Sequence, residues 1–254
     1  MRIDQHNIEI HENRRLWNKK PILRQLYRSF YTEIAAHINH LSNGCTLELG
    51  SGMGNVKDVI PECVTSDIFP NPWLDRTENA YALNFNDGSI DNLILFDVWH
   101  HLQFPGTALI ELGRVLTREG RLILFEPAAG LLGKIIYGLF HHEPLGLRQP
   151  IQWYAPDSFN PAKHGYYAAQ ANCWRMVRAN PKPSALENWH IREVKYYPAL
   201  AYAASGGFRK PKLYPDVALP FLLKLEVRLK PFPSIFATRM LVVMEKRKHY
   251  NNSN

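Results

Sequence analysis

The chain has 254 residues, of which 46% are hydrophobic and 21% charged, a composition that excludes a disordered chain, a collagen and a coiled coil. Thirty basic against 23 acidic residues give a net charge of +7, which suits an anionic partner and equally an ordinary basic enzyme. Three cysteines without a CxxC spacing favour a reducing, cytoplasmic compartment over a disulfide framework or a structural zinc site.

The N-terminal segment, residues 1–43, is expected to be helical. Its first fifteen residues are polar and lack the apolar core of a secretory signal. Apolar residues then recur every three or four positions from Ile22 to Leu41, and Asn43-Gly44 supplies a stop. No run in the chain reaches the ~20 apolar residues that span a bilayer.

Short apolar runs alternate with turn signals from residue 44 to residue 128. Residues 107–118 carry apolar positions at helical spacing, before a turn at Glu119-Gly120. The short apolar runs are residues 45–49, 63–67, 92–98 and 121–127. They are apolar on both faces, as the buried strands of a parallel sheet are. Strands and helix in this order predict an α/β sheet with right-handed crossovers.

The remainder of the chain differs in composition. Residues 129–189 are rich in aromatic residues, His and Pro without clean periodicity, and we expect them to form a lid. In the last part, 190–254, two late strands are expected at 190–203 and 237–247, separated by an amphipathic stretch at 217–230. With no repeat or low-complexity linker in sight, the whole chain, 1–254, is expected to be one domain.

A glycine-rich turn follows the first expected strand. Gly50, Gly52 and Gly54 stand at every second position, where bare backbone can turn tightly and approach a ligand. Asp67 ends the second strand, 19 residues after Glu48, where a carboxylate can accept hydrogen bonds from both hydroxyls of a ribose. The alternatives are an ordinary strand–helix turn and an aspartate that caps the next turn.

Four segments together resemble the class I S-adenosylmethionine-dependent methyltransferases, and especially the type 11-like group acting on small molecules, lipids and glycan precursors. They are TLELGSGMGN (46–55), TSDI (65–68), YALNFNDGSIDNLILFDVWHHL (81–102) and ELGRVLTREGRLILFEP (111–127). The resemblance makes 44–128 the cofactor-binding half. It implies a Rossmann-like, doubly wound, mainly parallel seven-stranded sheet with an antiparallel C-terminal strand, a lid after strand five, and S-adenosyl-L-methionine as cofactor.

The resemblance also implies a cofactor site. Asp67 would bind the ribose hydroxyls, and Ile68 would pack on the adenine. Near the adenine amino group the family often has an acidic residue, for which Asn79 and its neighbours must substitute. The full set is Glu48, Gly50, Ser51, Gly52, Gly54, Asp67, Ile68, Asn79, Ala80 and Tyr81, with Asp97 and Val98 bordering the methionine end. The two prolines shortly after Asp67 predict a short loop and a third strand around Leu74–Glu78, in place of the usual helix and strand.

A hydroxyl acceptor would need a general base, and a histidine suits that role near neutral pH. His100 and His101 follow the fourth strand at the ligand-binding edge, with a structural or cofactor-wall role as the alternative. His141 and His142 lie in the lid, where Glu143 could orient either ring or all three could simply be solvated. No metal site is expected there, because adjacent helical residues point about 100° apart. Glu126, at the end of strand five, is a further candidate base.

Two other features allow two interpretations each. The lid aromatics would form either a stacking wall for a ring substrate or the lid's own small core. The basic and apolar residues between 209 and 230 would meet an anionic membrane or lipid pyrophosphate, or form a core-facing helix with a solvated basic side. The lid aromatics are Trp153, Tyr154, Phe159, Tyr166, Tyr167 and Trp174.

The sequence therefore predicts a methyltransferase acting on a small molecule or a glycan or lipid-linked precursor, most simply by O-methylation. The alternatives are a C- or N-methyltransferase for a quinone, lipid or natural-product ring, and a non-catalytic binding module with the same fold. A nucleic-acid substrate is not expected, because the chain carries no RNA-binding module. A cytoplasmic location is expected, with peripheral contact at an anionic inner membrane face left open.

Overall fold

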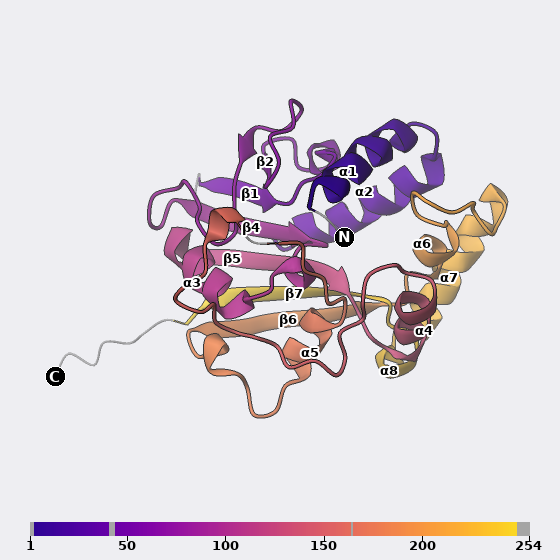
Figure 1. The fold of residues 1–254 in the computed structure, drawn as a ribbon. Coiled ribbons are helices and arrows are strands. Elements are labelled where there is room, and N and C mark those ends of the chain that lie inside the picture. The colour runs from indigo at the N-terminus through magenta and orange to yellow at the C-terminus, as the bar shows by residue number, and fades with distance from the viewer. Residues whose placement is uncertain (1–2, 41–43, 164, 248–254) are drawn as a thin grey trace.

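The centre of the molecule is a seven-stranded sheet (Figure 1). The computed structural model describes residues 3–40, 44–163 and 165–247. The strand order is β3-β2-β1-β4-β5-β7-β6, and only β7 runs antiparallel to its neighbours. The strands are β1 (Cys45–Leu49), β2 (Val64–Asp67), β3 (Arg76–Thr77), β4 (Ile90–Phe96), β5 (Leu116–Pro127), β6 (Trp189–Tyr197) and β7 (Arg239–Lys246). This confirms the predicted Rossmann-like sheet with its reversed C-terminal strand.

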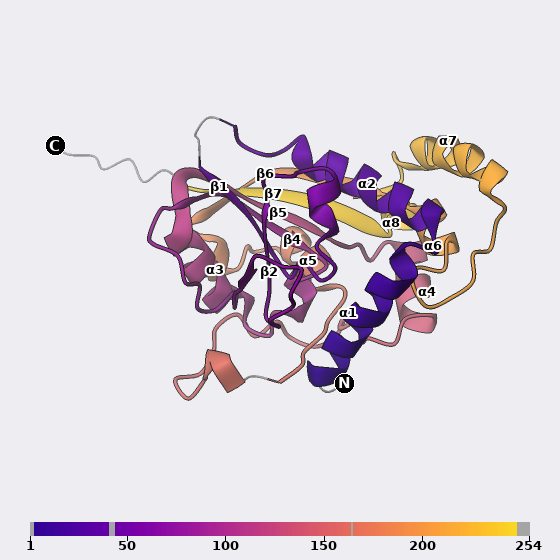
Figure 2. The same cartoon turned by 90° about the horizontal axis from the view of Figure 1, so that it is seen from above.

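Helices cover both faces of the sheet and gather at one end of it (Figures 1 and 2). They are α1 (Ile3–Trp17), α2 (Pro21–Ala35), α3 (Pro105–Val115), α4 (Leu131–Leu139), α5 (Asn172–Arg178), α6 (Leu200–Ala204), α7 (Leu219–Leu229) and α8 (Pro233–Phe236). Within the described residues, none of these helices combines the length and the hydrophobicity needed to cross a bilayer.

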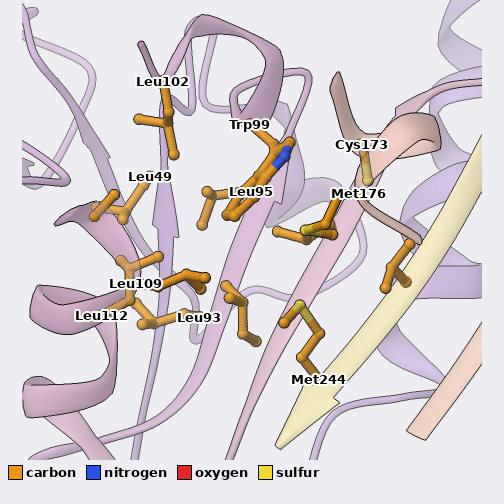
Figure 3. Packing of buried hydrophobic residues seen from close by; sticks show 14 of the residues in the cluster. Leu49, Leu93, Leu95, Trp99, Leu102, Leu109, Leu112, Cys173, Met176 and Met244 are labelled. Atoms are coloured by element: carbon orange, nitrogen blue, oxygen red, sulfur yellow. The ribbon is translucent and has the colours of Figure 1, made fainter. Parts of the chain in front are cut away.

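Alternate residues of the central strands build two cores, one on each face. Leu93 and Leu95 of β4 point to the face covered by α3 and α5, where Figure 3 shows them close to Leu109, Leu112 and Met176. Their neighbours along β4 point the other way and pack with residues of α2. Because both faces are covered, these strands have no polar side, which explains their continuous apolar sequence.

Several predicted boundaries were wrong for local reasons. The late strand expected to reach residue 203 ends at Tyr197, because Pro198 has no N–H for the ladder, and α6 follows. The turn at Glu119-Gly120 lies in an irregularity within β5 and does not close α3, which ends at Val115.

Two further boundaries also differ. The expected third strand is reduced to Arg76–Thr77, in the predicted place. α2 ends at Ala35, and the predicted stop at Leu41 and Asn43 lies outside the described residues.

Candidate functional site

A cavity of about 260 Å³ lies at the carboxyl ends of β1, β2 and β4, the edge at which open α/β sheets bind ligands. Its floor is formed by the residues that follow these strands: 49–53, 67–69 and 96–98. α1, α2 and the lid segment 165–167 supply the walls. Helix α1 lies in the segment expected to be helical, but its polar sequence has no clear apolar stripe, and its contribution of Ile10 and Asn13 to the cavity lining was not predicted.

At the start of the glycine-rich turn a side chain would not fit. Gly50 has a φ of 72°, and a Cβ there would lie 2.3 Å from Cγ2 of Val98. Ser51 joins this turn to β2, since its N–H donates to the Ser66 carbonyl oxygen at 2.7 Å and its Oγ accepts from the Ser66 N–H at 3.1 Å. The predicted helix after the turn is only a 3₁₀ turn, Asn55–Asp58.

Asp67 lies at the end of β2, beside this turn. Its Oδ2 accepts a hydrogen bond from the Gly52 N–H at 3.0 Å, and its Oδ1 accepts from the Phe69 N–H at 3.4 Å. A carboxylate has about four lone-pair sites and can accept several hydrogen bonds at once, including those of ligand hydroxyls. The cavity therefore offers a buried carboxylate next to exposed backbone.

The side of the cavity beyond Ile68 contains an acidic residue that the sequence analysis did not single out. Glu78 is buried and lines the cavity, but its carboxylate accepts from Arg76 Nε and from the Asn84 N–H, both at 2.9 Å. Asn79 is also engaged, because its Nδ2 donates to the Pro161 carbonyl oxygen at 2.8 Å. The contacts of both side chains stabilise the wall itself.

Asp97, at the end of β4, is held by a buried arginine. Its φ of 57° is unusual for a residue with a side chain. Both carboxylate oxygens accept from Arg239, at 2.5 and 2.6 Å, and the rings of Phe30, Phe96 and Phe125 surround the guanidinium. Arg239 is only 2% exposed, so its charge must be paired, and it fixes Asp97 at the cavity wall.

Glu48 is buried behind the turn and does not line the cavity. The Tyr31 hydroxyl donates to its Oε1 at 2.8 Å, whereas Oε2 has no hydrogen-bond partner among the described residues. Burial raises the pKa of Glu48 to about 7. Its proton is therefore bound in the folded state at a pH where an unfolded carboxyl has lost it.

This shift predicts a pH-dependent stability. Between pH 4.5 and pH 7 the folded chain holds a proton that the unfolded chain releases, so the contribution of Glu48 to stability falls by about 3 kcal/mol as the pH rises. Glu48→Gln removes this term. In urea unfolding, the free energy of the variant minus that of the wild type should rise by about 3 kcal/mol from pH 4 to pH 8. Glu187→Gln, at an exposed carboxyl, is the matched control and should follow the wild type at each pH. If the free energy of unfolding of Glu48→Gln changed with pH as that of the wild type does, the assignment to Glu48 would be contradicted.

His100 and Glu126 form a buried pair outside the cavity. Glu126 Oε2 lies 2.7 Å from His100 Nδ1, and its Oε1 accepts from the Val98 and Trp99 N–H groups at 2.8 and 2.7 Å. Burial lowers the pKa of His100, but Glu126 and Glu143 outweigh it and raise the pKa to about 10. His100 is therefore a cation at neutral pH, and the Glu126 oxygens are already engaged.

The two histidine pairs, distant in the sequence, converge on Glu143. His100 Nε2 and His101 Nε2 lie 3.6 and 3.9 Å from its oxygens, and His141 Nδ1 and His142 Nε2 both lie at 3.8 Å. The Tyr166 hydroxyl and the Gln170 amide also donate to it. Burial would raise the pKa of Glu143, but the hydrogen bond and the charge of His100 hold it far below its usual range.

Of these four histidines, all of which the structure describes, His101 alone lines the cavity. Its Nδ1 lies 2.9 Å from the Tyr167 carbonyl oxygen, an acceptor that requires a proton on Nδ1 and makes Nε2 the basic nitrogen. Donor atoms of His100, His101 and Glu143 lie within 4.8 Å of one another, a convergence that adjacent helical residues alone would not give. A metal ion could bind all three only if His100 lost a proton.

The cavity brings together most of the predicted site residues. Glu48, Gly54, His100, His141, His142 and Glu126 lie outside its lining, which contains Gly50, Ser51, Gly52, Asp67, Ile68, Asn79, Ala80, Tyr81, Asp97, Val98 and His101. The lid aromatics do not act as one group. Tyr166 and Tyr167 line the cavity, where a ring substrate could stack, whereas Trp153, Phe159 and Trp174 pack in the core. Tyr154 is exposed.

Comparison with known proteins finds similarity to methyltransferases, both in the sequence and in the fold. Residues 47–124 match the family model of the methyltransferase domain. A SAM-dependent methyltransferase from Archaeoglobus fulgidus is similar in structure, with a TM-score of 0.50, 11% identity, and 88% of this chain and 94% of that chain covered. No curated protein matches the sequence.

Two further solved structures align over most of their length. One is a SAM-dependent methyltransferase, possible histamine N-methyltransferase, from Thermotoga maritima, with a TM-score of 0.49, 14% identity, and 94% of this chain and 99% of that chain covered. The other is geranyl diphosphate C-methyltransferase from Streptomyces coelicolor, with a TM-score of 0.49, 11% identity, and 88% and 81% covered.

Proposed function

We propose that this chain, a class I S-adenosylmethionine-dependent methyltransferase by its domain match and its sheet, methylates a hydroxyl oxygen of a small molecule or of a glycan or lipid-linked precursor. When bound, the cofactor would supply a methyl group on a sulfonium, whose transfer to the acceptor oxygen breaks the carbon–sulfur bond and releases a neutral thioether. The protein must then bind and orient both reactants and receive the acceptor's proton. The observation that carries the O-methylation proposal is the position of His101 in the cavity wall.

The cavity fits the cofactor by its own chemistry. Gly50 could not carry a side chain beside Val98, and open space lies next to Gly52, so the bare backbone of this turn suits the amino-acid part of the cofactor. Asp67 offers a carboxylate to the ribose hydroxyls, and Ile68 an apolar surface to the adenine. Asp97 and Val98, at the end of β4, would border the methionine end, with Arg239 fixing the Asp97 carboxylate.

His101 is the proposed general base. Its Nδ1 proton, directed at the Tyr167 carbonyl oxygen, orients the ring and makes Nε2 the proton acceptor. Glu143 Oε1, at 3.9 Å from Nε2, would stabilise the imidazolium that forms when the acceptor hydroxyl loses its proton. The Glu143 carboxylate is ionised, because the His100 cation beside it lowers its pKa.

We assign His100 and Glu126 to positioning, because neither lines the cavity. Glu126 binds the two N–H groups that start the turn carrying His101, and His100 supplies the charge opposite Glu143. His141 and His142 complete the surroundings of Glu143 from the lid side. A cationic His100 has no lone pair with which to accept the acceptor's proton.

The acceptor class is tested by methyl transfer from cofactor labelled in its methyl group to fractionated cell extract. Label in lipid-linked glycan or small-molecule fractions, lost under conditions that cleave methyl ethers, is the expected result. Label in RNA, label stable as a C- or N-methyl group, or no label in any fraction with cofactor bound would contradict O-methylation of this acceptor class.

A further inference from the structure

The outer surface of α4 is apolar although it faces solvent. Leu131, Ile135 and Leu139 recur at intervals of four on the exposed side of the helix, and Phe140 follows directly. Leu139 is 74% exposed. The inner side is occupied by Gly133 and Tyr137. A surface helix of a soluble protein has its apolar residues on the inner side. An apolar outer side is typical of a surface that binds another molecule or a membrane.

Helix α8 extends the same surface. α4 and α8 lie side by side at the end of the sheet where the helices gather (Figures 1 and 2). Gly130 and Gly133 allow this close approach, because a Cβ on either would lie within 2.8 Å of the Ala237 carbonyl oxygen. Phe232 and Ile235, at the start of α8 and within it, are exposed as well. The two helices therefore present one fixed apolar surface.

Helix α7 adds apolar and basic residues together. Its inner side holds Leu219 and Glu226, whose Oε1 accepts from the Ala201 N–H at 2.7 Å. The outer side alternates Phe221, which is 67% exposed, and Val227 with Lys224. The alternative of a core-facing helix with a solvated basic side accounts for the buried Leu219, but it does not explain the exposed Phe221 and Val227.

The charge around these helices has one dominant sign. Residues 209–236 contain six basic and two acidic residues, a surplus of four within the chain's net +7, and Lys134 of α4 adds another positive charge. Glu226 points inward; of the six basic residues, Lys212 is paired with Asp216 and Arg209 with Glu9 of α1. Apolar side chains inside a basic surround match an anionic lipid surface, with its acyl chains below a layer of negative head groups.

We propose that the outer surfaces of α4, α7 and α8 form a docking face for an anionic lipid bilayer. Phe140 ends this face, and the next residues, His141–Glu143, belong to the lid cluster of the site. Lys210 ties the basic loop to the same point, since its Nζ donates to the Phe140 carbonyl oxygen at 3.1 Å. Docking would therefore bring the lid close to the membrane surface. The inference goes beyond the proposed methyl transfer and does not depend on it.

Sedimentation with vesicles of phosphatidylglycerol and phosphatidylcholine tests this face. The full chain should sediment with these vesicles at low salt, less at high salt, and not with pure phosphatidylcholine. Leu139→Ser and Phe221→Ser should each weaken binding about tenfold or more, through lost apolar contact. Lys224→Glu should weaken it by about tenfold at low salt.

Matched controls lie elsewhere on the surface. Ile110→Ser changes an apolar side chain on α3 that is 67% exposed, and Lys182→Glu reverses an exposed charge, so both should sediment as wild type does. Equal binding by the face variants and the controls, or no sedimentation at low salt, would overturn the proposal. So would self-association in the absence of lipid that Leu139→Ser abolishes, because the face would then belong to a second copy. Cofactor affinity, measured on the same variants, reports separately on the methyltransferase site.

Discussion

Asp67→Ala should weaken the binding of S-adenosylmethionine by about 100-fold or more, as measured by isothermal titration calorimetry. The carboxylate is placed to accept hydrogen bonds from two ribose hydroxyls, and hydrogen bonds to a charged group contribute about 1.5–3 kcal/mol each. A loss of about 3 kcal/mol corresponds to roughly two orders of magnitude in affinity. Asp67 also accepts from the Gly52 N–H, so part of the loss would come from a displaced turn.

Two variants separate these contributions. Asp67→Asn keeps an oxygen that can accept from the Gly52 N–H but loses the charge and one acceptor, so its affinity should fall between those of wild type and Asp67→Ala. Asp157→Ala removes an exposed carboxylate outside the cavity lining and should bind cofactor as wild type does. Wild-type affinity in Asp67→Ala, with the fold intact by circular dichroism, would refute the placement of the ribose.

His101→Ala should lower kcat for a hydroxyl acceptor by about 10²–10⁴-fold, the contribution typical of a positioned general base. The side chain lines the cavity, and Glu143 stands ready to stabilise its charged form. Single-turnover methyl transfer under saturating cofactor measures this loss directly, and binding of the cofactor should change far less. His190→Ala, at an exposed histidine on β6, is the matched control.

The pH profile distinguishes a base from a merely structural side chain. Wild-type kcat should rise with pH as the imidazole of His101 loses its proton, and that limb of the profile should be absent in the variant. A variant that retains the wild-type rate, or one that is slow but keeps the same profile, would assign the proton transfer to another group.

The sequence predicted the part of the fold that depends on local pattern. β1, β4 and β5 each contain a run of buried apolar residues because helices cover both faces of the sheet, and the turn after β1 carries a glycine where a side chain would not fit. The N-terminal segment was expected to be helical, but the bounds of α1 and its place at the cavity could not be predicted, because its sequence has no clear apolar stripe. The end of β6 was misplaced because the apolar run continues past Pro198, although the ladder does not.

Only those parts of the site that lie in short segments with a recognisable pattern were predictable. The turn at Gly50 and the carboxylate of Asp67 could be found from spacing alone. By contrast, His100 and Glu143 meet although they are 43 positions apart in the sequence, and Asp97 and Arg239 are 142 positions apart. An arginine at the start of an apolar strand was the one sequence signal for the second pair. Which histidine lines the cavity depends on how the lid folds over the sheet.

A crystal structure with bound S-adenosylhomocysteine is the most direct measurement of the central claim. The account predicts ribose hydroxyls against the Asp67 carboxylate, the amino-acid part along the Gly50 turn, and the sulfur on the side of the cavity nearest His101. A cavity left empty at saturating ligand, or a ligand bound with its ribose away from Asp67, would contradict it.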